Sequence, residues 1–250
     1  MKEIAPISDD LLNKCLAAIS GTDAIIVGGQ ALAYWAEYFD VDLFVTDSGI
    51  TKDLDVFGDR NHLMQMGAAL NASPQVQNPR FISALIGTIE IPISDNFASN
   101  VDVIHTIVGI ERHEVRRNAL KVKIANFDCN MMHPMHVLES RLKNIAEIPE
   151  KRNEQGVNQA ALAILVANRY IASRALEGGE SVALKAIEKV VSFAKISAGK
   201  MAADFGLNLI NAIPFDAIKN ENFQKIRKPQ IFTELAHLNN RGNLKTPNSV

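Results

Sequence analysis

The chain has little cysteine, no long apolar run and almost no excess of charge. Its two cysteines, Cys15 and Cys129, are too few for a disulfide framework or a cysteine-rich zinc site, and their scarcity fits a reducing compartment. The longest apolar run, Ala160–Ala167, is far shorter than the roughly 20 residues that a membrane-spanning helix needs. The N-terminus also lacks the apolar run of a signal peptide. These absences predict a soluble, cytoplasmic protein with no membrane partner.

The charge balance excludes another class of protein. Lysine and arginine number 26 against 28 acidic residues, a formal net charge of −2, so the chain lacks the basic signature of a dedicated nucleic-acid binder. Any nucleic-acid contact must therefore be local. What is present is 250 residues, of which 47% are hydrophobic, enough for one large domain or two modest ones. Collagen, coiled coil and wholesale disorder are excluded.

The hydrophobic patterns change near the middle of the chain. The first half alternates short β-like runs with helical patterns, whereas the part from about His133 onward reads as one helix after another. This predicts an α/β (α+β) fold, with a mixed central sheet in residues 1–130 and an α-helical domain in residues 131–240. Residues 241–250 are polar and are expected to form a flexible tail.

Local signals place the individual elements. Ser8 is expected to cap a helix that Gly21 closes, and Ala24–Val27 is expected to form a buried strand that leads into a second helix. Further strands are expected at 81–86, 88–93 and 100–104, with an edge strand at 120–124 and a polar loop at 71–80. Further helices are expected at 61–70 and in a segment that ends at residue 118. In the second half, helices are expected from Pro134 to Pro149, at 154–176 and from 181 to about 205, with shorter ones near Pro214 and Pro229.

Three features stand in an order that indicates phosphoryl chemistry. Gly28-Gly29 lies at a strand-to-helix turn, where backbone N–H groups and the helix dipole favour an anion. Asp53 and Asp55 are one residue apart on an expected strand and so share a face, while Asp102 lies on a later strand. Carboxylates in this arrangement suit Mg²⁺, which prefers a few carboxylates together with substrate phosphates.

With these residues, the chain resembles the DNA polymerase β-like nucleotidyltransferase superfamily. The runs Val27-Gly28-Gly29-Gln30-Ala31, Thr51 to Val56 and Val101-Asp102-Val103 are similar to its pattern hG[GS]…[DE]h[DE]h…h[DE]h. Within the superfamily the likeness is to the AbiEii/MenA-type group, several of whose members are toxins of toxin–antitoxin systems. It extends by motif to about His105, and a weaker similarity continues around Arg141.

The resemblance implies a nucleotidyltransferase fold and transfer of a nucleoside monophosphate from an NTP such as ATP to a hydroxyl or amine. The acceptor would be a small molecule, a protein side chain or a tRNA end, and an antitoxin protein is a candidate partner. Asp102 would also activate the acceptor. The implied ligands of Mg²⁺ or Mn²⁺ are Asp53, Asp55 and Asp102, and the implied nucleotide contacts are Gly28, Gly29, Gln30, Lys52, Arg141 and Lys143.

Two departures from the family pattern support an alternative. Gln30 stands where many members have serine, and no arginine shortly precedes Asp53, so that Lys52 alone supplies charge there. The alternative is a catalytically inactive scaffold that binds nucleotide, RNA or a protein partner. A dinucleotide-binding oxidoreductase is excluded because GxGxxG spacing is absent after Val27.

Other motifs favour structural roles. His133, His136 and Glu139 could converge on zinc, but Pro134 separates the first from the helical face of the others, which favours capping or surface roles. His105 either flanks the carboxylates or is a half-buried sheet residue. The run 111–117 is typical of a solvated helix face, and its alternative role is contact with an RNA backbone or a triphosphate.

Overall fold

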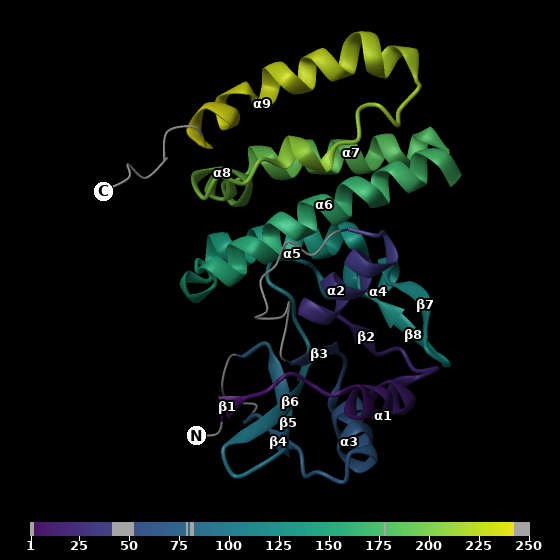
Figure 1. Cartoon of the computed structure of the whole chain (residues 1–250), viewed down its shortest axis with the longest axis vertical. Coiled ribbons are helices and arrows are strands. Elements are labelled where there is room, and N and C mark those ends of the chain that lie inside the picture. The colour runs from purple at the N-terminus through teal and green to yellow at the C-terminus, as the bar shows by residue number, and fades with distance from the viewer. Residues whose placement is uncertain (1–2, 42–52, 79, 81–82, 178, 243–250) are drawn as a thin grey trace. The chain divides into compact units, whose positions relative to one another are not determined.

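The computed structural model describes residues 3–41, 53–78, 80, 83–177 and 179–242. It is a mixed α/β structure with a central mixed sheet and many helices (Figure 1). No helix in the described part of the chain combines the length and apolarity needed to cross a bilayer. The elements up to residue 131 are β1 (Glu3–Ile4), α1 (Asp9–Ile19), β2 (Ile25–Ile26), α2 (Gly28–Tyr38), β3 (Leu54–Phe57), α3 (Arg60–Ala69), β4 (Gln75–Val76), β5 (Leu85–Pro92), β6 (Phe97–Ile104), α4 (Arg112–Asn118), β7 (Leu120–Ile124) and β8 (Phe127–Met131).

The rest of the described chain is helical. Its elements are α5 (Pro134–Glu147), the 3-10 turn η1 (Pro149–Lys151), α6 (Glu154–Glu177), α7 (Glu180–Lys195), α8 (Ser197–Asp204), the 3-10 turn η2 (Leu209–Ala212), the π-helical turn η3 (Phe223–Arg227) and α9 (Lys228–Gly242).

The chain divides into two compact units. The first comprises Met1–Tyr34 and Phe44–Val137, and the second comprises Trp35–Leu43 and Leu138–Val250. Helix α2 therefore starts in the first unit and ends in the second. A boundary at residue 130 would cut through β8, so the division observed here falls a few residues later and moves part of α2 to the helical unit.

The first unit is built on one mixed sheet. Its strand order is β4-β5-β6-β3-β2-β8-β7, and β1 pairs with the start of β6. The pairs β3/β6, β2/β8 and β1/β6 are parallel, and the other pairs are antiparallel. Two central strands thus run in the same direction side by side, which aligns their side chains in register.

One face of the sheet forms the core of this unit. Leu54 and Val56 on β3 lie beside Val101 and Val103 on β6, and all four are fully buried. Helix α3 packs against β5 and β6, and α1 packs against α3. Burial of such aliphatic side chains contributes roughly 1.5–3 kcal/mol each, so these strands are held firmly. The opposite face presents the alternate residues, including Asp55 and Asp102.

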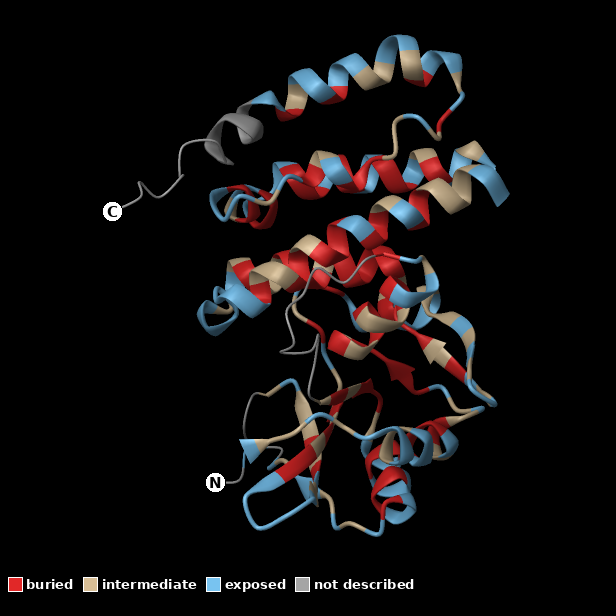
Figure 2. Cartoon of the chain, in the orientation of Figure 1, coloured by how far each residue is buried: buried red, intermediate tan, exposed pale blue. Residues whose placement is uncertain are grey.

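The second unit buries apolar stripes of α6, α7 and α9 (red in Figure 2). A polar clamp also joins two of these helices through η3. Arg227 donates from Nε and Nη2 to the two carboxylate oxygens of Glu188 on α7, at 2.6 and 2.7 Å, and from Nη1 to Glu234 on α9 at 2.6 Å. These bonds fix the last helix of the unit to α7.

Most predicted elements of the first half are confirmed. The Ser8 hydroxyl accepts from Leu11 N at 3.4 Å and Gly21 has φ +73°, so both ends of α1 form as predicted. The strand at β2, the helix at α2, the edge strand at β7 and the helix ending at residue 118 are also present. In the second half, α5 and α6 match their predicted ranges.

The structure differs from the predicted elements in several places. The strand β8 was not predicted, and the loop at 71–80 contains the short β4. Where strands were expected at 81–86 and 88–93, one strand, β5, runs from Leu85 to Pro92, because the irregularity between Leu85 and Gly87 is only a bulge; residues 81–82 lie outside the described residues. The helix expected from 181 to 205 is two helices, since Ile196 is extended, with ψ 171°. Of the expected tail, residues 241–242 belong to α9 and residues 243–250 lie outside the described residues.

Candidate carboxylate site

Gly28 and Asp55 lie in direct contact at the start of α2. Gly28 has φ +66°, and a Cβ atom added there would come within 2.0 Å of Oδ2 of Asp55. Val27 N donates to the backbone oxygen of Asp55 at 3.0 Å, which ties the two segments together. The glycine is therefore required twice, for its left-handed backbone and for the space that the carboxylate occupies.

Asp55 and Asp102 face each other across two parallel strands. They are direct partners in the β3/β6 register, and neighbouring strands lie about 4.8 Å apart. Asp55 is half-buried, as is Asp102. Burial raises the pKa of Asp102, and a hydrogen bond from Thr88 acts in the opposite direction. Two carboxylates at this spacing attract a cation, because each would otherwise repel the other.

Thr88 is a site residue that the sequence did not reveal. It lies on β5 directly opposite Asp102, and its hydroxyl donates to Oδ1 of Asp102 at 2.6 Å. This bond fixes one carboxylate oxygen and leaves the other for a ligand. The period-2 pattern of β5 could have placed Thr88 on a face, but only the register shows which residue it meets.

Asp53 precedes β3 by one residue and is half-buried. The sequence predicts Asp53 as the third ligand of the metal ion, beside Asp55 and Asp102. Within the described ranges, however, no three His, Cys, Asp or Glu side chains gather closely enough to hold one metal ion. The structure thus brings together Asp55 and Asp102, and the part of Asp53 in a metal site remains a prediction. The carboxylate oxygens of the pair are the donors that Mg²⁺ prefers.

The predicted phosphate-binding residues have different surroundings. Gly29 is buried and Gln30 is half-buried, and both lie in the first turn of α2. This turn starts at Gly28, which contacts the Asp55 carboxylate. Such N–H groups suit an anion because the helix dipole is positive there. Lys52 lies outside the described residues.

Arg141 and Lys143 both belong to the helical unit. Arg141 is buried and donates from Nη1 to Oε1 of Gln159 on α6 at 3.1 Å. Lys143 forms an ion pair with Glu139 on its own helix, at 2.9 Å. Both side chains thus have partners within α5 and α6, and their role in nucleotide binding stays a prediction.

The minor motifs have structural roles in the described residues. His133 Nδ1 accepts from Met135 N at 3.1 Å, which is a capping contact at the start of α5. His136 is buried rather than on the surface, because it lies on the inner side of that helix start. His105 is half-buried in a bend directly after β6, and its backbone N–H donates to Ala84 O at 2.9 Å. In the 111–117 run, Arg116 and Arg117 are ion-paired with Asp23 and Glu114.

Comparisons with known proteins give little information about this chain. No family model and no curated protein matches it. Among solved structures, the chain is similar to that of JHP933 from Helicobacter pylori, with 13% sequence identity and a TM-score of 0.42. The match covers 94% of this chain and 91% of that one.

Proposed function

We propose that the protein is a nucleotidyltransferase that uses Mg²⁺ and an NTP. The observation that carries the proposal is the contact of the Asp55 carboxylate with Gly28, with Asp102 in register beside it. This arrangement puts paired carboxylates directly against a helix N-terminus. A cation held by the carboxylates and a phosphate bound at the helix N-terminus would then be neighbours, as nucleotidyl transfer requires.

The residues of the chain supply binding, orientation and a base. The N–H groups of Gly28, Gly29 and Gln30 would bind the phosphates of the nucleotide. Mg²⁺, held by Asp55 and Asp102, would neutralise charge on those phosphates, and Asp53 is the third ligand that the sequence predicts.

The acceptor hydroxyl would give its proton to Asp102 while its oxygen forms a bond to the α-phosphorus, and pyrophosphate would leave. Burial raises the pKa of Asp102, which makes this carboxylate a better base than an exposed aspartate, and Thr88 holds it in place.

The test replaces Asp55 by Asn. The Asp55→Asn protein should fold normally, lose the thermal stabilisation by NTP that depends on Mg²⁺, and release no pyrophosphate with any acceptor. Asp95→Asn is the matched control, because Asp95 is an exposed carboxylate in the turn between β5 and β6. Unaltered pyrophosphate release by Asp55→Asn would overturn the proposal.

The inactive-scaffold alternative makes the opposite prediction in the same experiment. It rests on Gln30 in place of serine and on the absence of an arginine shortly before Asp53, and it predicts no Mg²⁺-dependent stabilisation by NTP and no pyrophosphate release in either the native chain or Asp55→Asn. Following the label from a series of radioactive NTPs into candidate acceptors, including tRNA, protein and small molecules, would then identify the acceptor class.

A further inference from the structure

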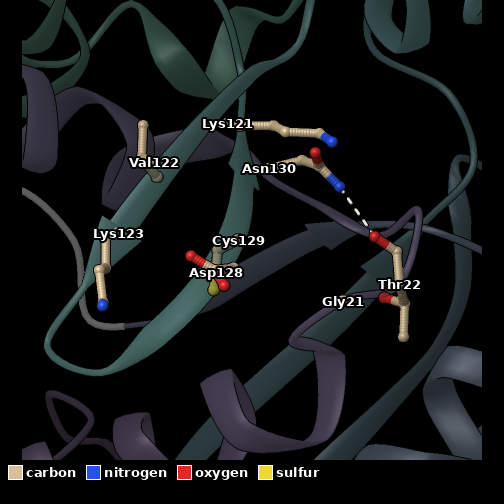
Figure 3. A pocket seen from close by; sticks show the side chains of 8 residues that line it. All are labelled: Gly21, Thr22, Lys121, Val122, Lys123, Asp128, Cys129 and Asn130. Atoms are coloured by element: carbon tan, nitrogen blue, oxygen red, sulfur yellow. Dashed lines mark hydrogen bonds between the residues drawn. The ribbon is translucent and has the colours of Figure 1, made fainter.

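A cavity lies in the first unit, between the β7/β8 hairpin and the turn that follows α1. Its volume is about 580 Å³, which is in the range of small-molecule sites (Figure 3). Its lining includes Thr22, Lys121, Lys123, Asp128, Cys129 and Asn130. None of them belongs to the carboxylate site.

The walls of this cavity are fixed by hydrogen bonds. Lys121 pairs with Asn130 and Lys123 with Asp128 in the β7/β8 register. The Asn130 side-chain amide donates to Thr22 O at 2.9 Å, the bond drawn in Figure 3, and to Ala24 O at 3.2 Å. Gly21 N and the Ser20 hydroxyl both donate to Asp128 O, at 3.1 and 3.2 Å. The hairpin is therefore held to the turn, and the cavity is preformed.

Both lysines are exposed, and Asp128 lies opposite Lys123 on β8. The lysines are two residues apart on β7, so they share a face and their Cα atoms lie about 7 Å apart. Across the part of the chain that the structure describes, neither forms an ion pair or a side-chain hydrogen bond, whereas Lys14 pairs with Asp10 and Lys225 with Glu221. Two lysine ammonium groups can both donate hydrogen bonds to a phosphate monoester, whose charge is about −1.5 to −2 at pH 7.

The cavity also contains a hydrogen-bond acceptor and a thiol. Asp128 is the one carboxylate among the lining residues, and it can accept a hydrogen bond from a ligand hydroxyl. Burial, together with the Asp128 charge, raises the pKa of Cys129, so this residue stays a neutral thiol at pH 7. The lining therefore suits reversible binding of a ligand that carries both a phosphate and a hydroxyl group.

The register separates this cavity from the carboxylate pair. Phe57 pairs with Ile25, Ile25 with Asn130, and Asn130 with Lys121, so Lys121 lies on the same face of the sheet as Asp55. Three strand spacings, roughly 14 Å, lie between β3 and β7. No residue that lines the cavity belongs to β3 or β6, the strands that carry the carboxylate pair, so the cavity is a separate site.

We propose that this cavity binds a small phosphorylated compound, with its phosphate between Lys121 and Lys123 and a hydroxyl group on Asp128. The inference does not depend on the proposed transferase activity. It concerns a second ligand, on the same face of the sheet as the carboxylates but apart from them, whose chemistry is that of a sugar phosphate.

The test measures binding of ribose 5-phosphate and of inorganic phosphate by calorimetry in EDTA, using the full chain with Asp55→Asn. This background and the absence of metal remove the carboxylate site from the measurement. We expect saturable binding of ribose 5-phosphate that Lys121→Gln with Lys123→Gln weakens at least about tenfold. The control pair, Lys185→Gln with Lys189→Gln, makes the same charge change on exposed positions of α7 and should have no effect.

Asp128→Asn tests the hydroxyl contact separately. It removes a negative charge near the phosphate, so inorganic phosphate should bind more tightly, while the preference for ribose 5-phosphate over inorganic phosphate should fall. Two results would overturn the proposal. One is binding that does not depend on the two lysines. The other is lysine-dependent binding of a single-stranded oligoribonucleotide with no binding of ribose 5-phosphate, which would make the surface a nucleic-acid site.

Discussion

Oδ2 of Asp55 occupies the space in which any residue other than glycine at position 28 would place its Cβ atom. The separation would be 2.0 Å, well inside a van der Waals contact, and the backbone at Gly28 is left-handed as well. The strand that carries the carboxylate and the turn that begins α2 thus determine each other's sequence.

The first prediction concerns Gly28→Ala. The added Cβ should displace the Asp55 carboxylate and destabilise the fold by more than about 2 kcal/mol, measured by urea unfolding. Gly206→Ala is the control, because Gly206 has φ +80° but nothing within 4 Å of its Cβ position. It should cost only the strain of the left-handed backbone, about 1 kcal/mol. Equal losses in the two variants would show that Asp55 moves aside freely.

The second prediction concerns pH and Asp102. Burial raises the pKa of this carboxyl above its unfolded value of about 3.9, so ionisation is disfavoured in the folded state. The stability that its protonated form contributes is present below pH 3.9 and is lost as the pH rises through the folded pKa. Asp102→Asn should therefore be more stable than the native chain at pH 7 in EDTA, and the difference should vanish in acid.

Urea unfolding at a series of pH values measures this difference, which amounts to roughly 1.4 kcal/mol per unit of pKa increase. Thr88→Val provides a companion variant, because it removes the hydrogen bond that lowers the pKa of Asp102. It should increase the pH-dependent loss of stability. A stability gain in Asp102→Asn that is the same at pH 4 and pH 7 would contradict the account.

The third prediction concerns Arg227→Lys in the helical unit. Lysine keeps the charge but cannot reproduce the bonds from one planar group to Glu188 and Glu234. We expect a loss of about 1 kcal/mol in urea unfolding, smaller in 1 M salt because the interaction is partly screened. Lys225→Arg is a matched control on the same turn, since Lys225 forms an exposed pair with Glu221. A loss that salt does not reduce would point to packing instead.

The elements that carry strong local signals could be predicted from the sequence. The cap at Ser8, the glycine at 21 and the alternation around Leu54 and Val56 each act within a few residues, and each forms as expected. Asp55 is half-buried between the fully buried Leu54 and Val56, so it lies on the opposite face of β3 from these two aliphatic residues.

The features that could not be predicted depend on contacts between residues that are far apart in the sequence or on the sheet register. Strand β8 contains Asp128 and Asn130, residue types that are depleted in strands, and it is held by its pairing with β2 and by contacts to residues 21–24. The break between α7 and α8 depends on a close approach that only Gly199 permits, since a Cβ there would come within 2.2 Å of Phe193 O. The two central aspartates were found by motif, but Thr88 became visible only through the register.

The discontinuous make-up of the helical unit determines the order in which it can fold. Its segment from Trp35 to Leu43 is synthesised long before Tyr170, whose ring centroid lies 6.3 Å from that of Phe39. During synthesis, Phe39 therefore lacks its contact with Tyr170 until more than 120 further residues have been added. The helical unit can be completed only after nearly the whole of the first unit has been made.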